Sequence, residues 1–129
     1  MNREQEDEGF KIDHHFPTSK GEPHIHYDNL FLSCDRCNHH KIDWWPSPKE
    51  FQRGVRYLNC CIEIEYGQHI FEKMDGNLVS NSPQGKYHIR MLKLSRPDLV
   101  RLRLKRRELL EKIHSSLHAD TFNFTENEV

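Results

Sequence analysis

Short apolar stretches separated by polar turns fill the first third of the chain. Alternating apolar and polar positions predict a strand that begins at Phe10 and ends near Pro17, and a returning strand over 29–33, NLFLS. The loop between them is rich in Gly, Pro and Ser. The segment 34–41 has the pattern of a knuckle that opens a short helix. We therefore expect the order strand, loop, strand, helix within 10–41.

Turn signals and a second set of short apolar runs follow. Pro46 and Pro48 end the first helix and turn the chain. Asp75-Gly76 lies between two β-prone runs, which is a strong hairpin signal. Alternation over 87–94, YHIRMLKL, predicts one further strand.

A helical pattern closes the chain. Ser95 has the position of a helix cap, with Pro97 and Asp98 in the first turn, where proline geometry and an acidic side chain both favour a helix start. We expect this helix to run to about residue 117. Its apolar positions keep roughly helical spacing: Leu99, Leu102, Leu110, Ile113 and Leu117.

These elements predict one α+β domain over 10–118, with a core at about 10–46 and an extension at 47–118. The ends, 1–9 and 119–129, hold few apolar residues and an excess of acid, so we expect them to be disordered.

Composition narrows the class of protein. The chain has 129 residues, 35% of them hydrophobic, and no apolar run near the roughly 18 residues that a membrane helix needs. Its acidic start, MNREQEDEGF, lacks the basic and then apolar pattern of a secretion signal. We therefore expect a cytoplasmic protein without membrane contact, whose four cysteines form no structural disulfides.

Positive charge is concentrated in one stretch, although the net charge of the whole chain is −1. Residues 86–107 hold nine Lys and Arg against a single acid, Asp98. A patch of this kind attracts polyanions. The run 101–107, RLRLKRR, is the densest part and has two interpretations: contact with nucleic-acid phosphates, or an ordinary solvated helix face.

Side chains that bind metals are concentrated in 12–41. This segment holds six of the ten histidines, two of the four cysteines, three aspartates and two asparagines. Polar groups at this density need partners or water, and an ordinary core does not require them. Asp13 and Asn38 offer oxygen ligands that suit Mg²⁺ or Mn²⁺, while imidazole widens the choice to Zn²⁺ or Ni²⁺.

The same residues resemble the motif of the HNH endonucleases, which have the ββα-metal or His-Me finger fold. The matching positions are Asp13-His14 on the first strand, Asn29 before the second strand, and Asn38 with Lys41 on the helix. The intervals of 15 residues from His14 to Asn29 and 9 from Asn29 to Asn38 also fit. The pattern NLFLSCxxCNxxK followed by WWP is similar to that of small bacterial members, some of them linked to restriction and anti-phage defence.

The resemblance implies a metal-dependent endonuclease that hydrolyses DNA, with RNA as an alternative substrate. It implies that His14 is the general base, that Asp13 and Asn38 hold one divalent cation, and that Asn29 fixes the loop and orients the His14 ring. Mg²⁺ is the expected cation, with Mn²⁺, Ni²⁺ and Zn²⁺ as alternatives. A partner protein in a defence system is a further implication.

Two positions in the motif have alternatives. His15 in place of His14 as base would shift the motif by one residue, but strand alternation puts Asp13 and His15 on one face and His14 on the other. His39 is an alternative to Asn38 as ligand. Adjacent helical residues point about 100° apart, so only one of them can face the ion.

The pair Cys34 and Cys37 has the spacing of half a structural Zn²⁺ site. Two thiolates do not complete a tetrahedral site, and the family's usual upstream pair is missing here. Either the pair stabilises a turn without metal, or further ligands come from elsewhere in the chain. The candidates for such ligands are Cys60, Cys61, His24, His26 and His40.

Several residues have plainer interpretations. The histidines outside 12–41 are expected to be surface or hydrogen-bonded structural residues: His69, His88, His114 and His118. Trp44 and Trp45 are expected to pack at a helix end. The candidate phosphate contacts are Lys41, Arg101, Arg103, Lys105, Arg106 and Arg107. The alternative function is a nucleic-acid-binding or partner-binding zinc-knuckle protein that has lost catalysis.

Overall fold

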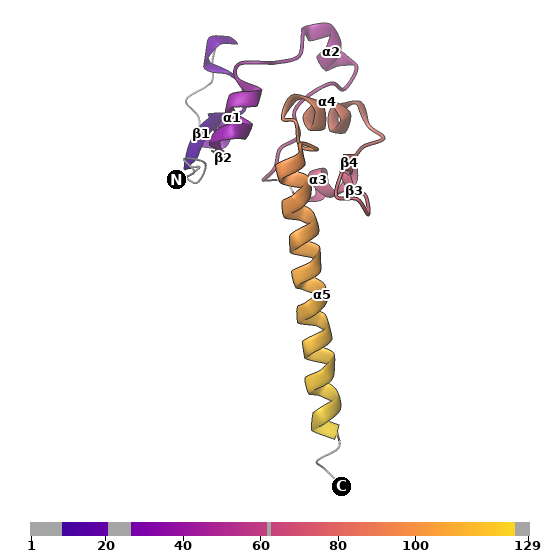
Figure 1. The fold of residues 1–129 in the computed structure, drawn as a ribbon. Coiled ribbons are helices and arrows are strands. Elements are labelled where there is room, and N and C mark those ends of the chain that lie inside the picture. The colour runs from indigo at the N-terminus through magenta and orange to yellow at the C-terminus, as the bar shows by residue number, and fades with distance from the viewer. Residues whose placement is uncertain (1–8, 21–26, 62, 126–129) are drawn as a thin grey trace.

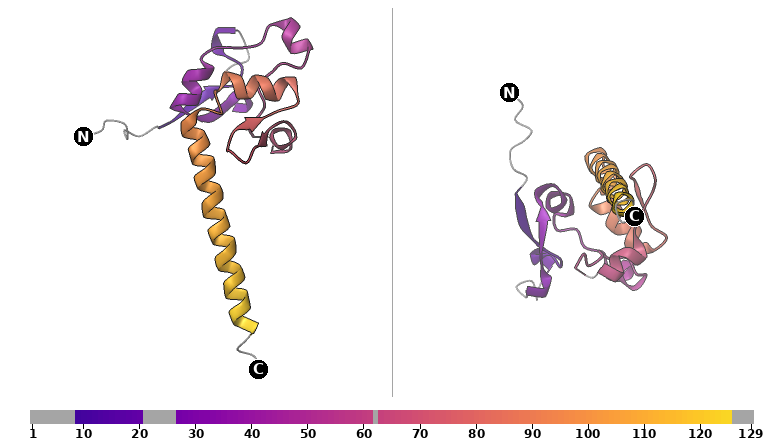
Figure 2. Two further views of the ribbon diagram at one scale, coloured as in Figure 1. Left: turned by 45° about the vertical axis from the view of Figure 1, so that its right-hand side comes forward. Right: turned by 90° about the horizontal axis from the view of Figure 1, so that it is seen from below.

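The computed structural model describes residues 9–20, 27–61 and 63–125 (Figure 1). The expected disorder at 1–8 and 126–129 lies outside these residues. Two small antiparallel hairpins and five helices make a mixed α+β fold in this part of the chain. The hairpins lie on opposite sides of the folded body, and the last helix extends away from it (Figure 2).

The first hairpin and helix form as the sequence predicts. Strand β1 (Phe10–His14) pairs with β2 (Leu30–Cys34), and two short 3₁₀ turns lie between them, η2 (Thr18–Lys20) and η3 (Tyr27–Asn29). Helix α1 (Asp35–Lys41) follows β2 directly and packs against both strands. The thiol of Cys34 accepts a hydrogen bond from the Cys37 amide and so caps this helix.

The second hairpin is also confirmed. Strands β3 (Phe71–Glu72) and β4 (Leu78–Val79) flank the Asp-Gly turn. Gly76 has φ +84°, and a Cβ atom there would lie 3.0 Å from the Val100 carbonyl oxygen. Both the backbone conformation and the close approach of the last helix therefore favour glycine at this turn.

The strand expected over 87–94 is wrong, because most of it lies in helix α4 (Pro83–Met91). Ser82 caps this helix by accepting a hydrogen bond from the Gly85 amide, and Pro83 occupies the first turn. Tyr87 and His88 are both buried, which fits a helix face and contradicts strand alternation. The cap and the proline were the decisive local signals, since short apolar runs alone are ambiguous.

Two short helices were not predicted. Helix α2 (Pro48–Gln52) begins at the proline that was expected only to turn the chain, and Ser47 and Glu50 form a complete capping box. Helix α3 (Glu63–His69) precedes the second hairpin. Prolines are tolerated in the first helical turn because no intrahelical partner is lost there.

Helix α5 (Pro97–Thr125) begins close to the predicted position but continues past residue 117, so 119–125 are helical rather than disordered. Ser95 does not cap it as expected. Its hydroxyl instead accepts a hydrogen bond from the Leu78 amide of β4 at 3.0 Å.

The small core lies between α1, α4 and the segment before α3. Its most buried apolar side chains are Tyr57, Leu58, Tyr87 and Leu94. Among the described residues, no helix combines the length and the apolar character needed to cross a membrane.

Candidate functional site

Three residues of the predicted motif, Asp13, His14 and Asn29, lie at one end of the first hairpin. Asp13 and His14 are the last residues of β1 and pair with Phe31 and Leu30 of β2. Asn29 comes directly before β2. Because the strands are antiparallel, the end of one lies beside the start of the other.

Asn29 fixes the loop that follows His14. Its side-chain oxygen accepts a hydrogen bond from the Phe16 amide at 2.6 Å, and its side-chain nitrogen donates to the Phe16 carbonyl at 3.0 Å. Its backbone carbonyl accepts a further bond from the His15 amide at 2.8 Å. The loop-fixing part of the expected role is thus present, whereas orientation of the His14 ring stays a prediction.

Asp13 is held by a lysine from α1. The ammonium group of Lys41 lies 2.8 Å from Asp13 Oδ1 and also donates to the His14 carbonyl. Lys41 is 3% exposed and Asp13 is 13% exposed, so this ion pair is shielded from water. The expected contact between Lys41 and a surface phosphate is therefore wrong: its charge faces inward.

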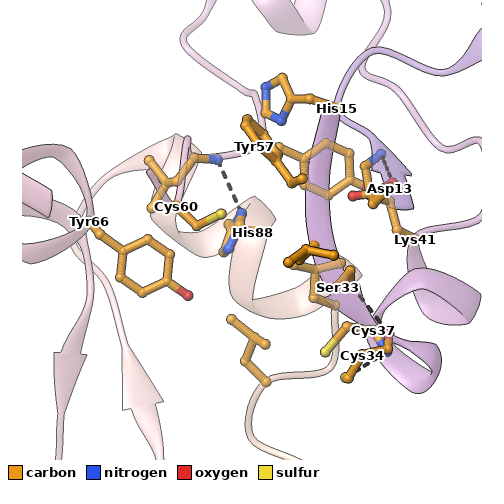
Figure 3. Close-up of a pocket in the computed structure, with 15 residues that line it drawn as sticks. Asp13, His15, Ser33, Cys34, Cys37, Lys41, Tyr57, Cys60, Tyr66 and His88 are labelled. Carbon is orange, nitrogen blue, oxygen red and sulfur yellow. Dashed lines mark hydrogen bonds and ion pairs between the residues drawn. The ribbon is translucent and has the colours of Figure 1, made fainter. Parts of the chain in front are cut away.

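Strand alternation separates the two candidate bases. Asp13 and His15 both line a partly open pocket of about 230 Å³, and His14 is not among its lining residues (Figure 3). The His15 ring packs edge-on against Phe31 and Trp45, with ring centroids 5.3 and 5.5 Å apart. This aromatic surrounding supports the interpretation in which His14 is the base.

The donors available to a divalent cation are few. Asn38 is half-buried on α1, one helical turn before Lys41, while His39 is exposed and borders a different groove. Among the described residues, no three His, Cys, Asp or Glu side chains lie close enough together to hold one metal ion. Asp13 keeps one carboxylate oxygen beyond its bond to Lys41. A carboxylate and an amide oxygen fit Mg²⁺, which keeps several of its waters.

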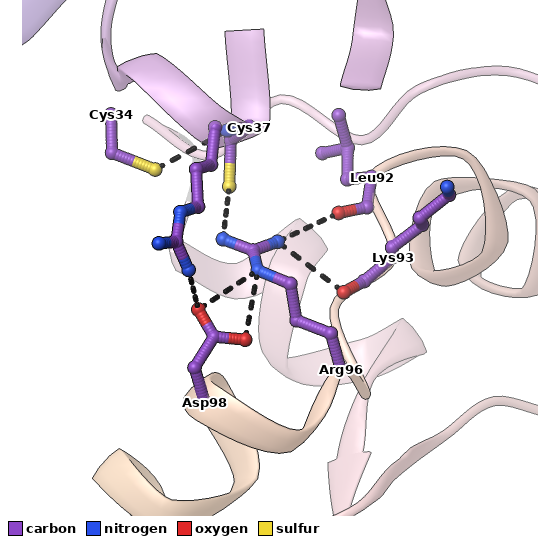
Figure 4. Close-up of polar contacts among 7 residues, drawn as sticks. Cys34, Cys37, Leu92, Lys93, Arg96 and Asp98 are labelled. Carbon is purple, nitrogen blue, oxygen red and sulfur yellow. Dashed lines mark hydrogen bonds and ion pairs between the residues drawn. The ribbon is translucent and has the colours of Figure 1, made fainter. Parts of the chain in front are cut away.

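Cys34 and Cys37 lie beside a polar cluster that joins α1 to α5 (Figure 4). Arg96 donates to the Cys37 thiol at 3.5 Å and to the Leu92 carbonyl at 3.0 Å, and its guanidinium also pairs with Asp98. Burial raises the pKa of Cys37, and the Arg96 hydrogen bond opposes this shift. No sequence pattern indicates this contact, because Arg96 and Cys37 are 59 residues apart.

Among the described residues, the candidate zinc ligands do not form a group that could hold a metal ion. Cys60 lines the same pocket as Cys34 and Cys37, but these three thiols are not joined there by a further His, Cys, Asp or Glu into a metal-binding group of the described chain. His40 borders a different groove from the cysteines. His24 and His26 lie outside the described residues. The structural Zn²⁺ site stays a prediction.

The basic run of α5 is divided between two roles. Arg103 donates to the Gly76 carbonyl at 3.2 Å, and Arg107 donates to the Met74 carbonyl at 2.6 Å. Arg106 pairs with Glu72 at 3.3 Å. Arg103 and Arg107 hold α5 against the second hairpin, and Arg106 makes an exposed ion pair with it. Arg101 and Lys105 are exposed.

Two histidines outside the motif are structural, as expected. His88 is 5% exposed, and its Nδ1 accepts a hydrogen bond from the Leu58 amide at 3.1 Å. His69 Nδ1 lies 2.8 Å from the Ser82 hydroxyl. The tryptophans differ: Trp45 packs against His15 and Phe16, whereas Trp44 is 58% exposed.

Searches of protein-family models, of curated proteins and of solved structures found no match to this chain.

Proposed function

We propose that this chain is a metal-dependent endonuclease with a ββα-metal core, which hydrolyses DNA phosphodiester bonds. The proposal rests on the two hydrogen bonds between the Asn29 side chain and the Phe16 backbone, here called the Asn29 clamp. The clamp lies next to the end of β1, which holds Asp13 and His14. A chain segment that bears a catalytic base must be held rigidly, because small errors in position cost large factors in rate.

The strands and the helix supply the groups that this chemistry needs. His14 is not among the residues that line the pocket beside Asp13, and in this proposal it takes a proton from a water molecule that attacks phosphorus. Asp13 and Asn38 would hold the cation, which supplies stabilisation of negative charge on the phosphate and on the leaving 3′-oxygen. Lys41 fixes the Asp13 carboxylate, so that its second oxygen keeps one direction.

The same ion pair favours a second candidate function. An ammonium group already neutralises Asp13, which reduces the attraction of this carboxylate for a cation. The second candidate is a protein of the same fold that binds nucleic acid or a partner protein without cleaving it. In such a protein Asp13 would have a purely structural role, as the partner of Lys41.

A plasmid-nicking assay separates the two candidates. Purified protein is incubated with supercoiled plasmid and Mg²⁺, Mn²⁺ or Ni²⁺, with EDTA as the metal-free control. We expect nicking with at least one cation, its loss in His14→Ala, and unchanged DNA binding by that variant. His114→Ala, an exposed histidine on α5, is the matched control and should cleave normally. Cleavage by His14→Ala at the wild-type rate would refute the assignment, and no cleavage with any cation would favour the second candidate.

A further inference from the structure

A second surface of the molecule has chemistry that the proposed active site does not use. A groove of about 380 Å³ lies between the end of α1 and the end of α4. Its volume falls in the range of about 300–1,000 Å³ that is typical of small-molecule sites. The residues on which the argument depends are His39, His40, Ile42, Trp44, Arg90 and Lys93.

The groove combines positive charge with an aromatic face. Arg90 and Lys93 are exposed, and no Asp or Glu is among the residues that line it. Figure 4 shows the Lys93 side chain directed away from the Arg96–Asp98 cluster, so that its charge is not used there. Trp44 is 58% exposed, unlike its neighbour Trp45.

The groove also holds unusual backbone. Ile42 has φ +47° and Lys93 has φ +48°, and these are the two non-glycine residues with positive φ in the described chain. Both border this one groove. Left-handed conformations cost free energy, particularly for a β-branched residue such as isoleucine, and residues of this kind cluster at functional sites.

Helix ends alone do not explain this arrangement. Basic side chains at the ends of α1 and α4 would be favoured by the helix dipoles. That explanation accounts for Arg90 and Lys93, but it gives no reason for an exposed tryptophan beside them or for two strained residues around it.

We propose that this groove binds single-stranded nucleic acid, with an unpaired base stacked on Trp44 and adjacent phosphates paired with Arg90 and Lys93. A tryptophan ring stacks on a base only when that base is not already stacked in a duplex, whereas exposed cations contact any phosphate. The combination therefore favours a single strand over a duplex. This inference rests on the proposed function, since it names the form of nucleic acid that the nuclease would hold near α1.

The test is binding without cleavage. The affinity of a fluorescein-labelled 12-nucleotide single strand is measured by anisotropy in EDTA at low salt, with the duplex of the same sequence alongside. We expect the single strand to bind more tightly than the duplex. Trp44→Ala should weaken single-strand binding about tenfold, and Trp44→Phe should restore most of the affinity. Arg90→Glu/Lys93→Glu should weaken binding further and reduce its dependence on salt.

Matched controls separate this site from general charge effects. Tyr27→Ala removes an aromatic side chain that is 87% exposed, and Lys49→Glu/Arg53→Glu makes the same change of charge on and beside α2. Both controls should bind like the wild type, and circular dichroism should show all variants folded. Equal losses of single-strand affinity in the groove and control variants would overturn the assignment of this groove as a single-strand binding site. Tighter binding of the duplex than of the single strand would overturn it as well.

The experiments distinguish failure of the groove proposal from failure of the nuclease proposal. A wild-type protein that never nicks plasmid but loses oligonucleotide binding in Trp44→Ala would refute only the nuclease. A protein that nicks plasmid and whose groove variants bind the single strand normally would refute only the groove.

Discussion

The ammonium nitrogen of Lys41 lies 2.8 Å from Asp13 Oδ1, and water reaches little of either side chain. This ion pair joins the last residue of α1 to the end of β1. Breaking a buried pair by removing one partner leaves an uncompensated charge and typically costs about 3–5 kcal/mol. We therefore expect Lys41→Met to lower the free energy of unfolding by that amount in urea titrations.

Two further variants test this cause. Lys49→Met removes an exposed lysine on α2, and we expect a change within about 0.5 kcal/mol. The double variant Asp13→Leu/Lys41→Met removes both charges and should regain much of the stability lost in the single variant. Additive losses in the double variant would contradict a coupled pair.

The Asn29 clamp predicts a second effect on stability. Asn29→Ala removes both hydrogen bonds to the Phe16 backbone and leaves two partly buried polar groups without this partner. We expect a loss of roughly 1–3 kcal/mol in chemical denaturation. Asn81→Ala, on an exposed residue, is the matched control. A loss no larger than that of the control would show that the loop does not depend on the clamp.

Local signals predicted the parts of the fold that depend on neighbouring residues. Strand alternation and the Asp75-Gly76 turn were sufficient for both hairpins, because each strand and the tight turn are specified by neighbouring residues. The strand proposed over 87–94 was wrong since its alternation and a helix face both fit the same apolar positions. Ser82 and Pro83 carry the local signal for a helix start at this position.

Contacts between distant segments were beyond sequence reasoning. The motif placed Lys41 three residues after Asn38 but gave no reason to pair it with Asp13, which is 28 residues away. Arg103 and Arg107 were candidates for phosphate contact, because a basic run has the same composition on a solvated surface and in a contact. Only the position of α5 against the second hairpin shows that these two guanidinium groups donate hydrogen bonds to backbone carbonyls.

Ile42 predicts a gain in stability. It ends α1 with φ +47°, a conformation that glycine adopts without steric cost. A non-glycine residue in so sparsely populated a backbone region costs about 1–3 kcal/mol, and the larger entropy of glycine in the unfolded chain offsets part of the gain from relieving this cost. We expect Ile42→Gly to raise the melting temperature. Ile12→Gly, at an exposed position in β1, should lower it, and a decrease in both variants would contradict strain at Ile42.

Asp98 predicts a pH dependence. Burial acts to raise its pKa, but the hydrogen bond and charge of Arg96, together with the hydrogen bond from Arg36, prevail and lower it below the ordinary value of 3.8. A carboxyl whose pKa is lower in the folded state stabilises the fold above its unfolded pKa, and this contribution is lost as the pH falls through the folded pKa.

The matching experiment compares unfolding at two pH values. Asp98→Asn should reduce stability at pH 7 by less than about 1 kcal/mol, since the pair is partly exposed to solvent. The difference from the wild type should shrink below about pH 4, where the unfolded carboxyl is protonated. Asp28→Asn, at an exposed residue, should show little change at either pH. A difference for Asp98→Asn that is constant with pH would exclude the charge as its cause.

The basic run on α5 contains exposed residues and residues that contact the second hairpin. We therefore expect that DNA affinity and the stability of the fold can be changed by separate substitutions in this run. Arg101 and Lys105 are exposed, whereas Arg103 and Arg107 donate to carbonyls of the second hairpin. We expect Arg101→Glu/Lys105→Glu to weaken duplex DNA binding in anisotropy titrations, and to do so more at low salt than at high salt because ions screen exposed charges. Its melting temperature should stay close to that of the wild type. Arg103→Met/Arg107→Met should instead lower the melting temperature. Equal losses of DNA affinity at both salt concentrations would contradict phosphate contact by Arg101 and Lys105, because an electrostatic contact must weaken as salt increases.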